Sequence, residues 1–204
     1  MISLHTYFTE KMVYNKATAF TYNYFPKTKE KLEDIIKQLI EERGNDGDFN
    51  DINTSEITDM SYLFSEMEEF NGDISKWNVS NVTNMEYMFQ LCTSFNQDIS
   101  NWDVSKVINM KNMFIYCESF NQSLNDWNVS KVENMEGMFA DCESFNQPLD
   151  KWDVSSVLNM WCMFNGCTSF NQNISKWNVS KVKKDKGEIF KKCPIKEKYK
   201  PKFK

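Results

Sequence analysis

Hydrophobic and polar positions repeat along this chain with a 25-residue period. Tryptophan opens five copies of the pattern Trp-x-Val-x-x-Val, at Trp77, Trp102, Trp127, Trp152 and Trp177. The first four copies continue through Asn-Met-x-x-Met-Phe-x-x-Cys, and a degenerate copy without tryptophan runs from Ile52 to Met60. A fixed period of this length is typical of a coil in which each unit covers the apolar face of its neighbour. The pattern therefore predicts a repeat solenoid.

Each unit predicts a strand, a turn and a short helix. An aliphatic residue between polar neighbours, as at Ile99, is typical of a short strand. In the segment 109–114, Met110, Met113 and Phe114 fall at i, i+3 and i+4, the spacing of one helical turn, and Asn109 before them is a common N-cap. The fold class that we expect is an α/β repeat solenoid of 25-residue strand–turn–short-helix units. Its strands would stack at ~4.8 Å into a parallel sheet.

The apolar positions of the repeat predict internal columns that run the length of the stack. Phe, Ile or Leu, Trp, Val, Met and Cys each recur in one register, so that each would pack on its copy in the next unit. An asparagine follows each repeat phenylalanine, which predicts a polar ladder that bonds backbone groups. Its members are Asn71, Asn96, Asn121, Asn146 and Asn171. We interpret these columns as structural.

The chain divides into three parts. Residues 1–48 contain an aromatic lead-in and then an amphipathic helix from Lys29 to Arg43, with Thr28 as N-cap and Gly44 at its end. We expect this helix to cap the first repeat. Residues 49–182 are the repeats: one degenerate copy, four full copies and a partial fifth. Residues 183–204 are predicted to form a C-terminal cap and a basic tail, mobile from Pro194.

The repeat motif resembles a known family. The unit Phe-Asn-Gln-x-Ile-x-x-Trp-Asp-Val-Ser-x-Val-x-Asn-Met-x-x-Met-Phe-x-x-Cys is similar to that of the BspA-like leucine-rich-repeat surface proteins. The variant is the one common in mycoplasma lipoproteins and also found in other bacteria and giant viruses, and the match covers residues 49–182. The resemblance implies a leucine-rich-repeat-like coil that serves protein–protein or adhesive binding.

Charge is distributed unevenly. The formal net charge of −5 combines a net +8 over residues 181–204 with about −13 over the rest of the chain. Lysine-rich segments bind nucleic acid or anionic membranes through counterion release. For this segment we favour a solvated terminus. The second alternative is contact with the acidic body of a neighbouring copy in a homo-oligomer. A nucleic-acid partner comes last.

The sequence indicates no catalytic, cofactor or metal site. The single histidine is His5, and the chain has no phosphate-binding glycine loop, nucleophile elbow or His-Glu-x-x-His motif. Four cysteines share one repeat position and are predicted to be buried and reduced rather than metal ligands. They are Cys92, Cys117, Cys142 and Cys167. We expect a protein that is not an enzyme and that needs no cofactor.

The location that we expect is cytoplasmic. The chain has no apolar run of about 18 residues, no secretory signal pattern at its start and no lipid-attachment cysteine. The alternative is a virion or a cell surface reached by another route.

Binding is predicted at positions that differ between copies beside the strand. These partner-binding candidates are Asp98, Ser100, Asn101, Ser123, Asn125, Asp126, Asp150, Lys151, Ser175 and Lys176. In repeat proteins such positions line one extended face, which is the usual binding surface. We therefore expect a non-catalytic scaffold that binds another protein through its strand face. The alternative is a structural or surface component, on a cell or a virion, that associates with itself.

Overall fold

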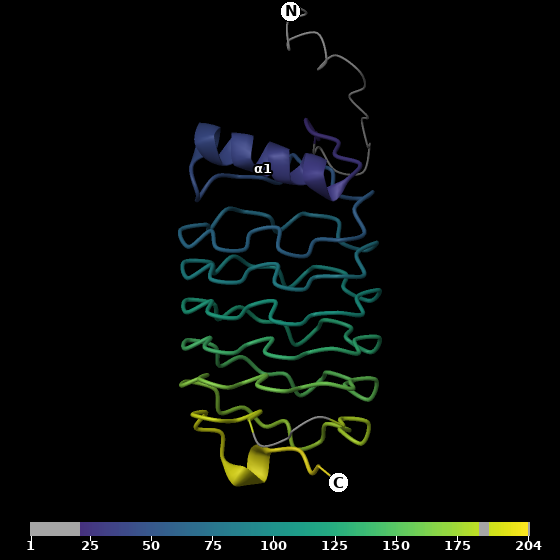
Figure 1. Ribbon diagram of the computed structural model, residues 1–204, viewed down its shortest axis with the longest axis vertical. Coiled ribbons are helices and arrows are strands. Elements are labelled where there is room, and N and C mark those ends of the chain that lie inside the picture. Colours follow the sequence, from purple (N-terminus) through teal and green to yellow (C-terminus); the bar gives the residue numbers. More distant parts are fainter. Residues whose placement is uncertain (1–20, 184–187, 204) are drawn as a thin grey trace, which may run out of the picture.

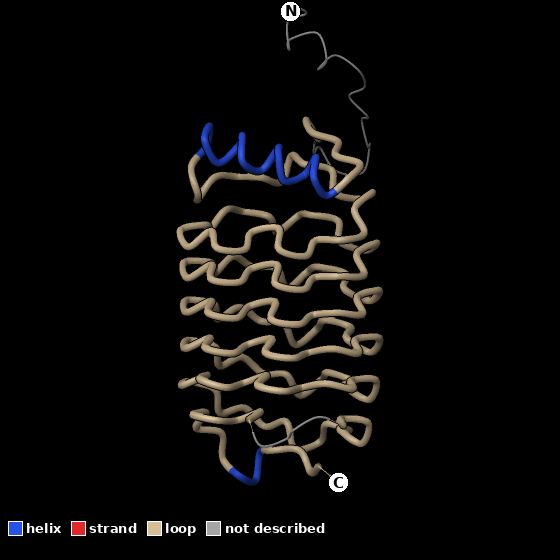
Figure 2. The backbone as a smooth tube through the Cα atoms, in the orientation of Figure 1, coloured by secondary structure: helices blue, strands red, loops and turns tan. Residues whose placement is uncertain are grey.

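The computed structural model describes residues 21–183 and 188–203. Two helices occur in these residues: α1 (Lys29–Arg43) and the short 3-10 helix η2 (Glu197–Tyr199). The rest of the described chain runs in successive layers of turns and loops, stacked between the two helices (Figures 1 and 2). Of the aromatic lead-in expected at 1–25, residues 1–20 lie outside the described part.

The prediction of an α/β repeat solenoid is wrong. Over 21–183 and 188–203 the repeats contain neither a strand nor a short helix, and parallel bridges such as Asn84 with Asn109 are isolated. The leucine-rich-repeat-like coil inferred from those units fails with them. The physical reason is that hydrogen-bonded turns follow one another too closely for a strand. In one layer, Trp102 N–H donates to Ile99, Val107 to Val104 and Met113 to Met110, at 3.1, 2.9 and 3.3 Å.

Successive layers are joined by backbone hydrogen bonds in a constant register. The N–H groups of Met85, Tyr87, Phe89 and Leu91 donate, each at 2.9 Å, to the carbonyls of Asn109, Lys111, Met113 and Ile115 in the next layer. The corresponding groups of that layer repeat the pattern, with Met110 donating to Asn134. Alternate residues thus satisfy their N–H groups between layers. The N–H groups of the residues in between donate to carbonyls of their own layer or to asparagine side chains.

Two positions in each layer have left-handed backbone. The first set, one residue from each successive layer, is Tyr62, Tyr87, Asn112, Gly137 and Cys162, with φ between 51° and 59°. The second set is Glu66, Leu91, Tyr116, Asp141 and Gly166, with φ between 56° and 75°. Tyr87 is the third residue of the turn that Met88 N–H closes onto Met85, where a type II turn requires positive φ. This repeated conformation bends the chain twice in the same places of each layer.

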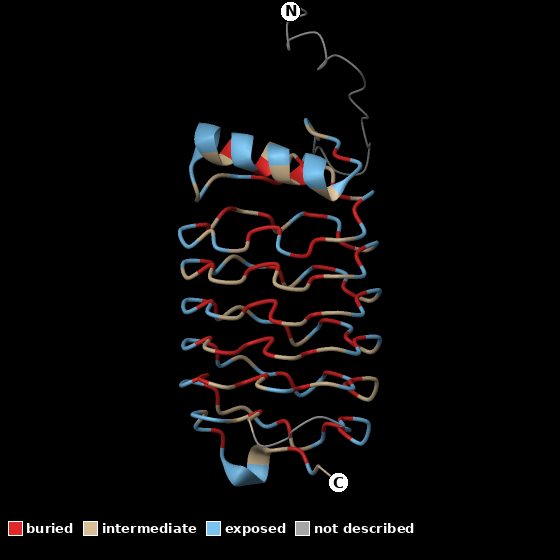
Figure 3. Cartoon of the chain, viewed as in Figure 1, coloured by how far each residue is buried: buried red, intermediate tan, exposed pale blue. Residues whose placement is uncertain are grey.

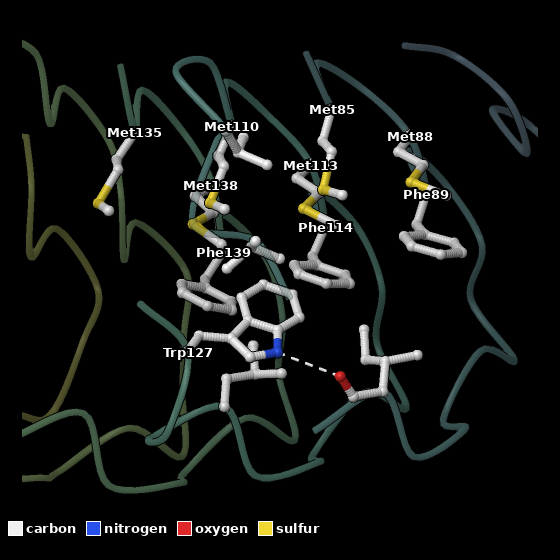
Figure 4. Close-up of a cluster of buried hydrophobic side chains, with 14 of the residues drawn as sticks. Met85, Met88, Phe89, Met110, Met113, Phe114, Trp127, Met135, Met138 and Phe139 are labelled. Atoms are coloured by element: carbon white, nitrogen blue, oxygen red, sulfur yellow. Dashed lines mark hydrogen bonds between the residues drawn. The ribbon is translucent and has the colours of Figure 1, made fainter. Parts of the chain in front are cut away.

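The interior consists of the predicted columns, which the structure confirms. The repeated Phe, Ile or Leu, Trp, Val and Met positions are buried, and buried and exposed segments alternate along each layer (Figure 3). Methionine and phenylalanine side chains from successive layers lie in register (Figure 4). The rings of Phe89, Phe114 and Phe139 stack with centroids 5.5 and 5.7 Å apart. Rings stacked at this separation stabilise the fold beyond the contribution of the area that they bury.

Three polar groups recur with the period and form hydrogen bonds between neighbouring layers. The indole nitrogen of Trp127 donates to the Ile99 carbonyl at 3.1 Å (Figure 4). The Cys142 thiol donates to the Phe114 carbonyl at 2.8 Å. The predicted asparagine ladder is confirmed, since the Asn121 N–H donates to the Asn96 side-chain oxygen at 3.0 Å. Each group satisfies a backbone atom that the turns leave without a partner.

Helix α1 forms as predicted and covers the N-terminal end of the stack (Figure 1). The Thr28 side chain accepts the Lys31 N–H at 3.3 Å, and Gly44 ends the helix at φ 77°. Its apolar stripe, Leu32, Ile36 and Leu39, is fully buried against the first layer. The helix thus shields columns that would otherwise end in water.

Residues 188–203 cover the other end of the stack. The prediction of a tail that is mobile from Pro194 is wrong, because Ile195 is buried and Lys196 N–H bonds the Asn171 side chain at 3.1 Å. The Ile174 N–H donates to the Tyr199 carbonyl at 3.0 Å. The Phe190 ring continues the phenylalanine column, because it stacks on Phe164 with centroids 5.8 Å apart. The basic segment is therefore a part of the folded end.

A left-handed backbone position tolerates some side chains better than others, and this difference can be tested. Asn adopts positive φ far more readily than a β-branched residue. At Tyr116, with φ 61° and a half-exposed ring, we expect Tyr116→Val to be less stable than Tyr116→Asn by about 1–2 kcal/mol. Urea denaturation of the two variants measures the difference, and equal stabilities would contradict the assignment of strain to this position.

Burial of the cysteine ladder makes stability depend on pH. The four ladder thiols are buried and free, as predicted. Desolvation raises the pKa of Cys92 to about 12 and the pKa of Cys142 well above its usual range. An unfolded thiol loses its proton near about pH 8.5, whereas the folded one keeps it. The unfolded state therefore binds fewer protons above that pH, and the free energy of unfolding must fall as the pH rises.

We expect each buried thiol to contribute a slope of roughly 1.4 kcal/mol per pH unit above about pH 8.5. Cys142→Ala should make the pH dependence of the unfolding free energy shallower by that amount. The half-exposed Cys162 offers a matched control, and Cys162→Ala should change the slope less. Urea denaturation at several pH values tests this, and an unchanged slope in Cys142→Ala would show that its thiol ionises normally.

Candidate binding surfaces

The ten predicted partner-binding residues lie in equivalent segments of successive layers, where they are exposed or half-buried. We call this surface the polar face. Its members are Asp98, Ser100, Asn101, Ser123, Asn125, Asp126, Asp150, Lys151, Ser175 and Lys176. They flank the buried column of Ile99, Leu124, Leu149 and Ile174. The face exists without the strand that was expected beneath it.

Internal hydrogen bonds hold much of the polar face. The Asp98 carboxylate accepts the Ser100 N–H at 2.9 Å, which fixes a local turn. The Asn125 amide donates to Asp150 at 3.1 Å, and its oxygen accepts the Lys151 N–H at 3.1 Å. The structure therefore brings together residues of two neighbouring layers, and it gives several of them a structural role.

Local contacts favour the charged forms of Asp98 and Lys151. Hydrogen bonds from the side chain and backbone of Ser100 lower the pKa of Asp98. The Lys151 ammonium lies 2.7 Å from Asp126, which raises the pKa of the lysine. Since both partners of this ion pair are largely exposed, it contributes little to stability. It does place opposite charges side by side for a ligand.

Two shallow hollows open on the polar face. One, of about 260 Å³, is lined by residues that include Asn125, Asp126 and Lys151. The other, of the same volume, includes Asp150 and Lys176 among its lining residues. Both hollows are small beside the ~300–1,000 Å³ of a small-molecule site. They fit the side chains of a protein partner better than a cofactor.

A second surface carries the exposed apolar side chains. Six large hydrophobic residues are exposed among the described residues, and five of them lie in the equivalent segments 58–66, 108–116 and 158–166. We call the side of the stack formed by these segments the aromatic face. The five residues are Tyr62, Ile108, Tyr116, Leu158 and Trp161, which are 38–50% exposed.

Charged groups accompany these apolar groups. The rings of Tyr62 and Tyr87 stack with centroids 4.8 Å apart. Lys29 of α1 lies 5.8 Å from the Tyr62 ring, and Lys111 lies 5.7 Å from the Tyr87 ring. The Lys111 ammonium also lies 3.5 Å from Glu136. Cation–π contacts and an ion pair thus hold the charged side chains that lie between the exposed apolar ones.

Sequence reasoning missed the aromatic face. Its residues stand at variable positions of the longer motif Val-x-Asn-Met-x-x-Met-Phe-x-x-Cys, where Glu86-Tyr87 in one copy becomes Trp161-Cys162 in another. The signal was present, because a tryptophan at a position that is charged in other copies is unusual. The segment was interpreted as a short helix, which drew attention to its inward methionines.

Metal ligands do not gather in the described part of the chain. No group of three or more His, Cys, Asp or Glu residues there is placed to hold a metal ion. Between residues 21 and 203, leaving out 184–187, no helix is long and apolar enough to cross a membrane.

Comparison with known proteins identifies the family and nothing finer. No curated protein matches the chain, and no solved structure matches it. Residues 30–140 and 101–200 match the family described as Mycoplasma protein of unknown function, DUF285. The two matches overlap and together span the helix, the repeats and most of the C-terminal end. The chain therefore belongs to this family of repeat proteins of unknown function.

Proposed function

We propose that this is a non-catalytic protein that binds another protein through the aromatic face. The observation that carries the proposal is the exposure of Ile108, Leu158 and Trp161, because the other large apolar side chains of the described residues are almost all covered. Exposed apolar groups that gather on one side commonly mark an interaction site. Tryptophan and tyrosine are also the residues that contribute most to binding energy at protein interfaces.

The backbone of this face favours binding for a second reason. Every layer is fixed to the next by hydrogen bonds such as Tyr87 N–H to the Lys111 carbonyl, at 2.9 Å. A rigid surface loses little conformational entropy when a partner docks, so more of the contact energy appears as affinity. Large side chains on a rigid stack are therefore well suited to recognise one partner.

The polar face stays a predicted binding surface. Its residues differ between layers, but Asn125, Asp126 and Lys151 already bond to one another or to neighbouring backbone. A partner would have to replace those bonds or add to them. We therefore rank the polar face after the aromatic face as a binding surface.

Kinship with the BspA-like surface proteins is also a proposal. The long repeat motif supports it, and the family match to a group of mycoplasma proteins agrees with it. An adhesive role would follow from that kinship. The expected cytoplasmic location and the absence of enzyme activity stay predictions.

The test compares two surface variants. The aromatic-face variant combines Ile108→Lys, Leu158→Lys and Trp161→Lys, and the polar-face variant combines Ser100→Arg, Asn125→Arg, Asp150→Arg and Ser175→Arg. A protein captured by the native chain from its own cells is purified and its affinity for all three is measured. We expect the aromatic-face variant to lose at least about tenfold in affinity, because interface Trp truncations commonly cost about 2 kcal/mol or more.

The polar-face variant serves as the matched control and should bind as the native chain does. Thermal unfolding of both variants checks that each is folded. Loss of binding in the polar-face variant alone would move the site to that face. Equal affinity of all three chains for the purified partner would remove binding from both faces.

A further inference from the structure

The two ends of the stack carry opposite charge. Residues 21–69, which contain α1 and the first layer, have thirteen Asp and Glu against five Lys and Arg, a net charge of −8. The described residues after Ser180 have eight Lys against Glu188 and Glu197, a net charge of +6. The layers between, residues 70–180, have a net charge of −6 spread over more than twice the length of chain. The molecule is therefore an electrically polar column.

The basic charge belongs to the folded C-terminal end. Lys196, Lys198 and Lys202 are exposed around η2, which lies beyond the last layer (Figure 1). The Lys196 and Lys198 ammonium groups lie 5.5 and 5.2 Å from the Tyr199 ring. The backbone beneath that ring is held because the Tyr199 carbonyl accepts the Ile174 N–H. The structure thus presents these lysines from a fixed surface, where a mobile tail had been expected.

The acidic charge of this end lies mainly in the first layer, since residues 44–69 contain eight Asp and Glu and no Lys or Arg. Helix α1 adds five Asp and Glu against four Lys and Arg, and its outer side faces away from the stack. The outward residues Asp34, Glu41 and Glu42 of α1 are exposed, while Leu32, Ile36 and Leu39 face the first layer. Among the described residues no other layer lies beyond the helix (Figure 1). Beside the helix, a hollow of about 500 Å³ is lined by Met67 and by Glu41, Glu66, Glu68 and Glu69 among others.

We propose that the basic C-terminal end of one molecule docks onto the acidic α1 end of a second copy. Charge complementarity identifies a second copy as the occupant, because the basic end of one copy attracts the acidic end of another. The contact joins the C-terminal end of one molecule to the α1 end of another. The pair therefore still has one free basic end and one free acidic end. Such a heterologous contact does not close by two-fold symmetry, so it propagates into a linear array. The aromatic face runs along the sides of the column and stays open in that array.

The association must respond to salt and to concentration. Charges on exposed surfaces attract across about 30 Å at 0.01 M salt but only across about 3 Å at 1 M. We expect the purified chain to form species that lengthen with concentration at about 0.02 M salt and to be monomeric at about 0.5 M. Sedimentation velocity measures their mass, and small-angle X-ray scattering distinguishes end-to-end growth from side-by-side packing.

Charge reversal gives a sharper test. One variant combines Lys196→Glu, Lys198→Glu and Lys202→Glu, which removes the net positive charge of the C-terminal end. The other combines Asp34→Lys, Glu41→Lys and Glu42→Lys, which weakens the acidity of the α1 end. We expect each variant alone to associate at least about tenfold more weakly than the native chain at low salt. An equimolar mixture of the two should associate again, because the native end of each variant meets its complement on the other.

A control variant reverses the same number of lysines on the sides of the column, with Lys106→Glu, Lys131→Glu and Lys151→Glu. It should associate as the native chain does. A native chain that is monomeric at every concentration at low salt would overturn the proposal, as would equal association in all variants. Binding of anionic lipid vesicles by the lysine end of such a monomer would assign that end to a membrane surface instead. Binding of a separate protein to the aromatic face is measured independently and is unaffected by either result.

Discussion

The structure depends on hydrogen bonds between equivalent backbone groups of successive layers. A layer made of closely spaced turns cannot satisfy its own N–H groups, because each turn bonds only one of them locally. The remaining donors, such as those of Met110 and Phe114, reach the carbonyls of Asn134 and Met138 in the next layer. This constant register is available only if every layer contains the same number of residues and bends at the same places. The fixed period of the sequence is the expression of that requirement.

The same constraint separates the interior from the surface. Once layers are in register, each inward position meets its own copy, so that phenylalanine packs on phenylalanine and the thiol of one layer bonds the layer before it. Outward positions meet solvent and are free to differ, which is how Trp161 can stand where other layers have Glu86 or Lys111. The ends cannot be free, since an uncovered layer exposes whole columns. Helix α1 and residues 188–203 cover them, and the layer beneath α1 is acidic whereas residues 188–203 are basic.

Sequence reasoning succeeds where a pattern has one physical meaning. The spacing of Leu32, Ile36 and Leu39 after Thr28 defines a capped helix, and a cysteine at one repeat position defines a buried ladder. It fails where several backbones share a pattern. Alternation around Ile99 suits a strand or a chain of turns equally well, and the choice depends on left-handed residues such as Tyr87 and Leu91. These residue types carry no local signal for positive φ, so layer-to-layer packing imposes it. The aromatic face was missed because its segment was interpreted as a short helix, although Trp161 stands where other copies carry a charge.

Hydrogen exchange at single amides tests the central claim most directly. In the segment 110–116, the amides of Met110, Asn112, Phe114 and Tyr116 bond the next layer, whereas that of Lys111 bonds the Asn109 side chain. Donors between layers exchange only when layers separate, so they should be the slow set, and the same order should recur in the following layer. We predict that Phe114 and Phe139 exchange far more slowly than Lys111 and Glu136. Equal rates in the two sets would contradict a stack held by bonds between layers.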